Sequence, residues 1–253
     1  MSTVARRTLQ LLGGILVLGG CQGDMLRLGN GRDGGSPGGE AADALEPDGT
    51  GGAIDVDNCL RGQIKASEVT WIGDTWVTLP GTQHTRVRDL ARAAGAIGPT
   101  DDYTIAAAPA VTMAAVTTQY ATQESSQTKV KVLIMDGGTW DTIVSGGSDA
   151  SVADVAATFR QFLTQVAADG TVEQIIYYLC PELPGIPGVA ALRPLLEQAC
   201  TESSVPCHFL DLQPLWAGHP EYTDSSGIQA SAAGAKVIAD AIWAIMQQSC
   251  LAQ

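Results

Sequence analysis

Residues 225–243 read SSGIQASAAGAKVIADAIW, a polar turn that leads into an apolar helical run. Glycine and serine favour the turn, and apolar residues at helical spacing predict a last helix over residues 231–248. Gln229 stands just before this helix, at a place where a turn can hold a catalytic side chain. A glutamine amide does not take up a proton at neutral pH, so Gln229 is unsuited to be a general base.

Upstream of this helix, short apolar runs alternate with amphipathic helical patterns. Such alternation is typical of an α/β fold with a parallel sheet. We therefore expect a three-layer, flavodoxin-like domain with about five parallel strands and helices on both faces. The expected strands are residues 68–72, 103–107, 129–135, 173–180 and 207–212, and the expected helices are residues 85–94, 113–123, 152–168, 189–199 and 231–248.

Three polar, glycine-containing turns follow or precede these elements. In sheets of this kind, ligands bind beyond the carboxyl ends of the strands, so the residues that follow each strand matter most. We expect the three turns to meet at one edge of the sheet. They read Gly73-Asp74-Thr75-Trp76, Asp136-Gly137-Gly138-Thr139-Trp140-Asp141 and Ser226-Gly227-Ile228-Gln229.

In this order, the three blocks resemble those of the SGNH (GDSL-type) hydrolases, over most of residues 66–248. The ending GIQASAAGAKVIADAIW carries the resemblance most strongly, because the family commonly has Asp-Gly-Ile-His-Pro, a small residue, Ala-Ala-Gly and an apolar helix there. In the family, a Ser attacks an ester, a His takes its proton, and an Asp orients the His. An Asn, a Gly and a backbone N–H stabilise the oxyanion. The resemblance implies no cofactor.

The resemblance places substituted residues at all four chemical positions of the family. Thr75 occupies the nucleophile position, and Trp140 occupies the position of the oxyanion Asn. Ser226 stands at the position of the orienting Asp, and Gln229 stands at that of the His. The family's second glycine block has no evident counterpart. The residues that match the family pattern are Gly73, Asp74, Gly138 and Asp141.

A hydroxyl nucleophile without a base is weak, and disabling a serine-type triad removes most of its rate enhancement. We therefore interpret the domain as a pseudoenzyme whose cleft binds an acyl or carbohydrate ligand. The alternative is an active esterase or carbohydrate deacetylase with a rebuilt site, which uses Thr75 and His219 as an alternative base. His84 is expected at the surface, and His208 is expected in or beside the last strand.

Aspartates at the strand ends raise the question of a metal site. Asp74, Asp136 and Asp141 could converge there, with Asp224 nearby, and carboxylates bind Ca²⁺ or Mg²⁺. Aspartate is also the usual cap of turns and helices, and this accounts for the four positions better. We therefore predict no metal.

The charge balance argues against a nucleic-acid partner. The chain has 14 Lys and Arg against 27 Asp and Glu, for a formal net charge of −13, and no basic stripe is present in its sequence. Nucleic-acid binding rewards clusters of Lys and Arg. A like-charged, soluble surface is the plainer interpretation.

The N-terminus predicts export and a lipid anchor. Basic residues, an apolar run and Leu-Gly-Gly-Cys make residues 1–20 a signal peptide, whose ending resembles the lipobox of bacterial lipoproteins. Cys21 would be the lipidated residue, and Gln22 implies an outer-membrane destination in a Gram-negative host. Residues 21–58 are rich in Gly and Asp and predict a disordered tether, which leaves residues 59–253 as the domain.

Five cysteines follow Cys21, in a compartment that permits disulfides. Cys200 and Cys207 flank a turn-like segment, and Cys59 and Cys250 stand at the two ends of the domain, which often lie close together. Both pairs are disulfide candidates, although the sequence does not fix the connectivity. The odd count leaves at least one cysteine over, and these pairings would leave Cys180.

Overall fold

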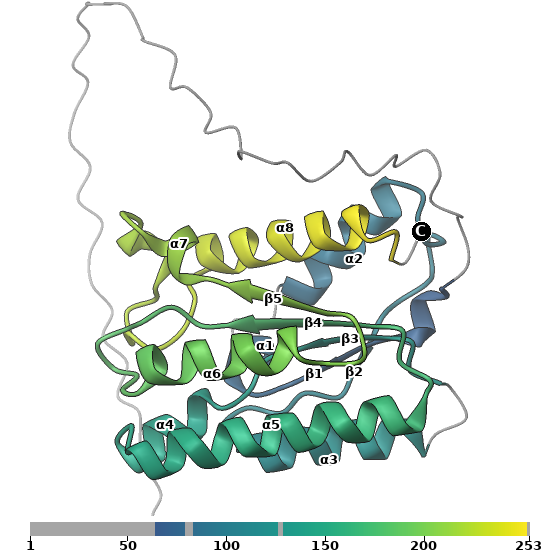
Figure 1. Ribbon diagram of the computed structural model, residues 1–253. Coiled ribbons are helices and arrows are strands. Elements are labelled where there is room, and N and C mark those ends of the chain that lie inside the picture. Colours follow the sequence, from purple (N-terminus) through teal and green to yellow (C-terminus); the bar gives the residue numbers. More distant parts are fainter. Residues whose placement is uncertain (1–63, 79–82, 126–128, 252–253) are drawn as a thin grey trace, which may run out of the picture. The chain divides into compact units, whose positions relative to one another are not determined.

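The computed structural model describes residues 64–78, 83–125 and 129–251 (Figure 1). The chain divides into two compact units, Met1–Thr50 and Gly51–Gln253, and every described residue belongs to the second. The predicted signal peptide, the lipidation site Cys21, the tether and Cys59 lie outside the described residues, so those expectations stay predictions. Within the described ranges, no helix is long and apolar enough to cross a bilayer.

Five parallel strands form one sheet in the order β2-β1-β3-β4-β5. Trp71 of β1 pairs with Ile105 of β2 on one side and with Ile134 of β3 on the other. This order is the flavodoxin-like one, so the expected α/β class is confirmed. The strands are β1 (Val69–Ile72), β2 (Thr104–Ile105), β3 (Val132–Met135), β4 (Gln174–Leu179) and β5 (Cys207–Asp211).

Helices cover both faces of the sheet, which gives the three expected layers (Figure 1). Helices α2 (Gln83–Ala93) and α8 (Ala232–Gln248) pack together on one face. The other face carries α3 (Met113–Glu124), α5 (Asp149–Asp169) and α6 (Val189–Thr201).

Five short helical segments were not predicted, because so few residues show no periodic pattern. Two of them, α1 and α4, begin just beyond the carboxyl ends of β1 and β3 and therefore belong to the edge where ligands bind in such folds. The short segments are α1 (Thr75–Thr78), α4 (Thr139–Ser145), α7 (Gln213–Trp216), and the 3₁₀ turns η2 (Ala66–Glu68) and η3 (Pro220–Tyr222).

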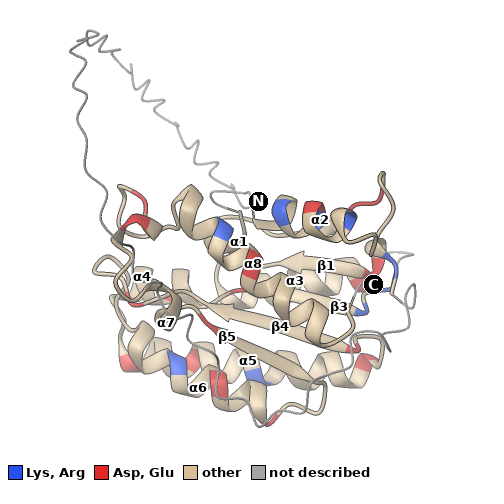
Figure 2. Ribbon diagram, turned by 90° about the horizontal axis from the view of Figure 1, so that it is seen from above, with Lys and Arg blue, Asp and Glu red and all other residues tan. Residues whose placement is uncertain are grey.

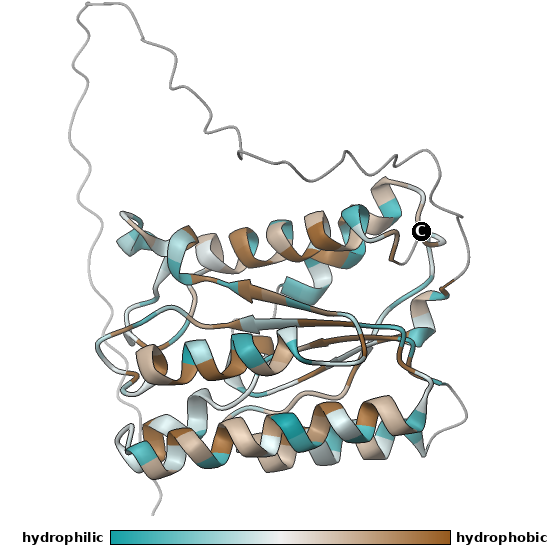
Figure 3. Ribbon diagram, viewed as in Figure 1, coloured by the Kyte–Doolittle hydropathy of each residue, from teal (hydrophilic) through white to brown (hydrophobic). Residues whose placement is uncertain are grey.

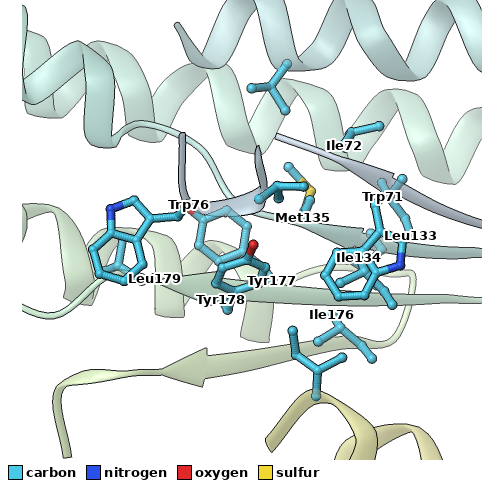
Figure 4. Packing of buried hydrophobic residues seen from close by; sticks show 14 of the residues in the cluster. Trp71, Ile72, Trp76, Leu133, Ile134, Met135, Ile176, Tyr177, Tyr178 and Leu179 are labelled. Carbon is cyan, nitrogen blue, oxygen red and sulfur yellow. The ribbon is translucent and has the colours of Figure 1, made fainter. Parts of the chain in front are cut away.

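The core lies on both sides of the sheet. Every residue of β1 and β3 is buried, as expected of parallel strands that carry helices on both faces. The apolar faces of the long helices turn toward the sheet (Figure 3), and Figure 4 shows Trp71, Trp76 and Ile134 among the buried side chains. The ring of Tyr177 packs 4.7 Å from that of Phe159 and 5.8 Å from that of Phe209, measured between centroids.

Lys, Arg, Asp and Glu residues are distributed over the helices and loops (Figure 2). Arg86 of α2 reaches Asp240 of α8 at 2.6 Å, and this ion pair links the two helices that share one face. A disulfide joins Cys200 to Cys207, with Cα atoms 5.2 Å apart, and so ties the end of α6 to the start of β5. The Cys59–Cys250 pairing stays a prediction, because Cys59 lies outside the described residues.

Candidate active site

A small hollow lies at the carboxyl ends of β1 and β3, where the chain order of the sheet reverses. Its volume is about 140 Å³. The structure brings Thr75, Trp140 and Gln229 together around this hollow, as the three-turn hypothesis requires. The lining residues are Asp74, Thr75, Trp76, Pro109, Ala110, Thr139, Trp140, Ile143, Ile228 and Gln229.

The turn after β1 depends on Gly73. Its φ of 146° is one that residues with a side chain rarely adopt, and a Cβ there would lie 1.8 Å from Oδ1 of Asp136. Gln119 of α3 holds both backbone groups of this glycine. Its Oε1 accepts the Gly73 N–H at 2.7 Å, and its Nε2 donates to the Gly73 carbonyl at 3.0 Å. The missing side chain therefore lets a carboxylate approach the backbone.

Two buried carboxylates, Asp74 and Asp136, join the starts of α1 and α4. Oδ1 of Asp136 accepts the Asp74 N–H at 2.7 Å, and its Oδ2 accepts the Trp76 N–H at 3.2 Å. Asp74 in turn accepts the N–H groups of Trp76 at 3.2 Å and of Trp140 at 3.3 Å. These bonds fix Thr75, which lies between Asp74 and Trp76, beside Trp140.

The environment of this pair changes the acidity of Asp136. Burial raises the pKa of Asp136 well above its ordinary value, and the neighbouring Asp74 carboxylate raises it further. We therefore expect Asp136 to keep its proton at pH values where an exposed aspartate is ionised. A neutral carboxyl beside a carboxylate costs much less than two buried negative charges side by side.

The hydroxyl of Thr75 faces a backbone donor. Its Oγ1 accepts the N–H of Ala110 at 3.0 Å. Ala110 has a φ of 55°, a left-handed conformation that glycine adopts far more readily than alanine. Ala110 therefore brings a backbone donor to the hollow, and sequence reasoning missed it because alanine carries no signal of a positive φ.

Trp140 lines the hollow from α4, and the residues around it hold that helix in place. Gly138 has a φ of 85°, and a Cβ on it would lie 2.6 Å from Val155 of α5, so glycine is required. The hydroxyl of buried Thr139 lies 3.4 Å from the sulfur of Cys180. Burial raises the pKa of Cys180 to about 12, which keeps its thiol protonated.

Asp141 matches the family pattern but is not among the lining residues. Its Oδ2 accepts the N–H of Met113, the first residue of α3, at 2.9 Å. Burial raises the pKa of Asp141, and this backbone hydrogen bond opposes the shift. Asp141 therefore links α4 to the start of α3.

In the turn before α8, Gln229 lines the hollow and Ser226 is not among the lining residues. Oδ1 of Asp224 accepts both the N–H of Ser226, at 3.0 Å, and its hydroxyl. The N–H of Asp224 donates to the Gln229 carbonyl at 2.9 Å, and Thr223 pairs with Ala230, which closes the turn. The side-chain amide of Gln229 makes no hydrogen bond to any described residue. Its polar atoms are therefore available to a ligand.

None of the three histidines of the chain lines the hollow. His219 lies 2.9 Å from Oε1 of Glu221 and stacks on Tyr222 with centroids 4.4 Å apart. Its hydrogen bond lowers the pKa of Glu221. His208 bonds to Gln174 at 3.0 Å, and His84, expected at the surface, is half-buried and packs edge-on against Trp71. Burial lowers the pKa of both His84 and His208.

Aromatic rings connect the hollow to the turn before α8. Trp76 is 1% exposed and lines the hollow, and its ring packs edge-on against Trp216 with centroids 5.9 Å apart. Trp216 contacts Tyr222 at 5.5 Å and donates its Nε1–H to Thr223 at 3.1 Å. The indole N–H of Trp76 has no hydrogen-bond partner within the described ranges.

The carboxylates of the site face backbone N–H donors, which is the arrangement of caps and not of metal ligands. Within the described part of the chain, no group of three or more His, Cys, Asp or Glu is placed to hold a metal ion.

No family model and no curated protein matches the sequence. Solved structures do match. A family 3 carbohydrate esterase from Clostridium thermocellum is 14% identical with a TM-score of 0.59, over 73% of this chain and 98% of its own.

Two further structures match at 13% identity. A mutant acetyl esterase with an acetate ion has a TM-score of 0.58, over 72% of this chain and 97% of its own. A GDSL-like lipase from Parabacteroides merdae has a TM-score of 0.57, over 74% and 97%. At these identities the likeness concerns the fold, and the described domain has an SGNH-like fold.

Proposed function

We propose that the protein is an extracytoplasmic lipoprotein whose SGNH-like domain has lost ordinary ester hydrolysis and binds an acyl or carbohydrate ligand in the hollow. One observation carries the proposal. Thr75 and Gln229 line the same hollow of about 140 Å³, and none of the three histidines lines it.

Ester hydrolysis in this hollow would depend on the proton of the Thr75 hydroxyl. Attack on an ester requires that a base remove this proton, and the amide of Gln229 is not basic. The carboxylates of Asp74 and Asp136 already accept backbone N–H groups on the inner side of the site. Disabled serine-type triads keep roughly 10³- to 10⁴-fold of their enhancement over water, and the oxyanion hole and binding supply this remainder. Here Trp140 also replaces the oxyanion Asn, so we expect negligible turnover.

The walls of the hollow favour binding of a small apolar group. The apolar side chains of Trp76, Trp140, Ile143 and Ile228 are among the lining residues. A volume of about 140 Å³ is well below the roughly 300–1,000 Å³ of pockets that enclose whole drug-sized ligands. The hollow therefore suits one short acyl group or one face of a sugar, with the rest of the ligand outside.

Hydrolysis of p-nitrophenyl acetate and butyrate by the purified protein tests the loss of activity. We expect the wild type and the Thr75→Ala variant to give the same rate, indistinguishable from buffer. Turnover that disappears in Thr75→Ala would overturn the proposal. It would favour the rebuilt esterase, for which labelling of Thr75 by a fluorophosphonate should also be lost in His219→Ala.

Restoring the family's residues tests whether the scaffold is intact. We expect the variant with Thr75→Ser, Trp140→Asn, Ser226→Asp and Gln229→His to gain weak esterase activity. The matched control carries the same changes with Ala in place of Ser at position 75. A folded quadruple variant that stays as inert as this control would show that the scaffold has diverged beyond its acyl-transfer geometry.

Membrane attachment is tested separately in cells of a Gram-negative host. Basic residues, an apolar run and Leu-Gly-Gly before Cys21 support lipidation of that cysteine. We expect labelled palmitate to enter the wild-type protein and the protein to sediment with outer membranes. Cys21→Ala should abolish both, and a labelled or sedimenting Cys21→Ala variant would contradict the proposed anchor.

A further inference from the structure

The hollow presents unused hydrogen-bonding groups of both kinds. The Thr75 hydroxyl accepts the Ala110 N–H with one lone pair, which leaves its own proton free to donate. The Gln229 amide, unpaired within the described ranges, offers N–H donors and one carbonyl acceptor. A ligand that fits should supply both an acceptor and a donor.

The charges around the hollow favour a neutral ligand. No Lys or Arg is among the lining residues, whereas Asp74 is, with no exposed surface of its own. A carboxylate in the hollow would lie close to this acidic group without a cation to balance it. A free acid such as acetate is therefore a poor fit, and an uncharged acyl group of the same size is a better one.

The Gln229 amide discriminates between two neutral acyl groups. An ester accepts hydrogen bonds but donates none, so it would leave the Gln229 carbonyl without a partner in a site it has closed. An amide of the same size accepts through its carbonyl and donates through its N–H. A buried polar group that is left unpaired costs more than a formed hydrogen bond gains, so this difference favours the amide.

We propose that the hollow recognises the acetamido group of an N-acetylated ligand, in preference to the matching O-acetyl ester and to free acetate. The methyl group would lie against the apolar walls made by Trp76, Trp140 and Ile228. The carbonyl would accept from the Thr75 hydroxyl, and the amide N–H, which points the opposite way in a trans amide, would donate to the Gln229 carbonyl. This inference rests on the proposed non-hydrolytic function, because it needs a ligand that stays intact.

The test measures binding of four probes to the full-length protein by ligand-observed NMR and calorimetry. The probes are methyl N-acetylglucosaminide, methyl 2-O-acetylglucoside, methyl glucosaminide and sodium acetate. We expect the N-acetyl compound to bind at least about tenfold more tightly than each of the others, which corresponds to about 1.4 kcal/mol. Equal or tighter binding of the ester or of acetate would overturn the inference.

A second arm identifies the source of the acetamido group. Nε-acetyl-lysine methylamide carries the same group on an amino-acid scaffold. Tighter binding of the sugar would indicate an N-acetylated glycan. Tighter binding of the lysine derivative would indicate an acetylated peptide. Both results support recognition of the acetamido group. If none of the probes binds at millimolar concentration and at least 20-fold molar excess over the protein, the inference is wrong. The proposed function would then require a different acyl or carbohydrate ligand.

Variants of Gln229 separate recognition from folding. Gln229→Met keeps the length of the side chain and removes its donor and acceptor, so the preference for amide over ester should fall to less than about threefold. Gln247→Met, on the exposed side of α8, is the matched control and should keep the preference. An unchanged preference in a folded Gln229→Met protein would contradict the assignment. Release of acetate from the ester probe would instead refute the non-hydrolytic function itself.

Discussion

The floor of the hollow and its rim differ in how firmly they are held. The floor consists of Gly73, Asp74, Gln119 and Asp136, and each of them makes hydrogen bonds that fix a neighbouring segment. The rim is the turn of residues 223–230, where the Gln229 side chain bonds to no described residue. Gly73 and Asp74 of the floor match the family pattern, whereas the rim carries two of the substituted chemical positions, Ser226 and Gln229.

This difference indicates that stability and chemistry are separable in this domain. Changing a floor residue leaves buried polar groups without hydrogen-bond partners or creates a steric clash. Both effects lower the free energy of unfolding. The side chain of Gln229 makes no hydrogen bond to a described residue, so we expect that this residue can be replaced without loss of the fold.

The largest effect is expected for Gly73→Ala. Its Cβ would lie 1.8 Å from Oδ1 of Asp136 at a φ of 146°, so the clash and the backbone strain should together cost about 4 kcal/mol or more. Gly218→Ala is the matched control, because its φ is 80° and no atom lies within 4 Å of the added carbon. It should cost about 1 kcal/mol. Urea unfolding measures both, and equal losses would contradict the close approach at Gly73.

Gln119→Leu should lower the free energy of unfolding by about 1–3 kcal/mol. The Gly73 N–H would lose its acceptor, while the Gly73 carbonyl would keep the N–H of Ala108 at 3.1 Å. Gln161→Leu, on the exposed surface of α5, is the control and should change stability by less than about 0.5 kcal/mol. A tolerated Gln119→Leu, measured by the same unfolding experiment, would show that water replaces the amide at Gly73.

Asp136→Asn should change how stability depends on pH. Because the pKa of Asp136 is raised on folding, the folded protein binds its proton more tightly than the unfolded chain does. This contribution is complete below the unfolded pKa of about 3.9 and is lost as pH rises toward the folded pKa, by up to about 1.4 kcal/mol per pH unit. Asparagine does not ionise, so its own contribution to stability does not change with pH. The variant should therefore gain stability relative to the wild type as pH rises.

Urea unfolding at several pH values between 4 and 8 measures this difference. The exposed Asp154→Asn variant serves as the control, and its difference from the wild type should stay nearly constant. A constant difference for Asp136→Asn as well would mean that Asp136 is ionised throughout and that the floor holds two carboxylates.

The smallest effect is expected at the rim. Gln229→Ala should change the free energy of unfolding by less than about 0.5 kcal/mol, because its amide bonds to no described residue. Gln247→Ala on α8 gives the background value for an exposed glutamine. A loss above about 1 kcal/mol for Gln229→Ala alone would remove the distinction between floor and rim.

Most of the fold could be predicted from the sequence, because long periodic segments determine it. The run KVKVLIM and the amphipathic stretch 152–168 led to β3 (Val132–Met135) and α5 (Asp149–Asp169), with shifted bounds. The single-turn helices α1 and α7 carry no period, and β2 is only two residues long. Such short elements are set by their neighbours and not by their own residues.

The candidate site was less accessible to sequence reasoning. The sequence predicted that Thr75, Trp140 and Gln229 lie close together, because the turns that follow parallel strands meet at the same edge of the sheet. Ala110 was missed because a positive φ is a property of the backbone. Ser226 was expected beside Gln229, but Asp224 holds its hydroxyl away from the hollow. The role of Asp136 depends on an approach to Gly73 that no pattern of residues reveals.

The contact between Trp76 and Trp216 should give an optical signal that changes when a ligand occupies the hollow. Two indoles with centroids 5.9 Å apart and planes inclined by 63° should couple their electronic transitions and give a paired near-ultraviolet circular dichroism band. Only Trp76 of this pair lines the hollow, so a guest molecule should alter the band without any label. Screening of compound collections by this signal needs neither a substrate nor a known activity.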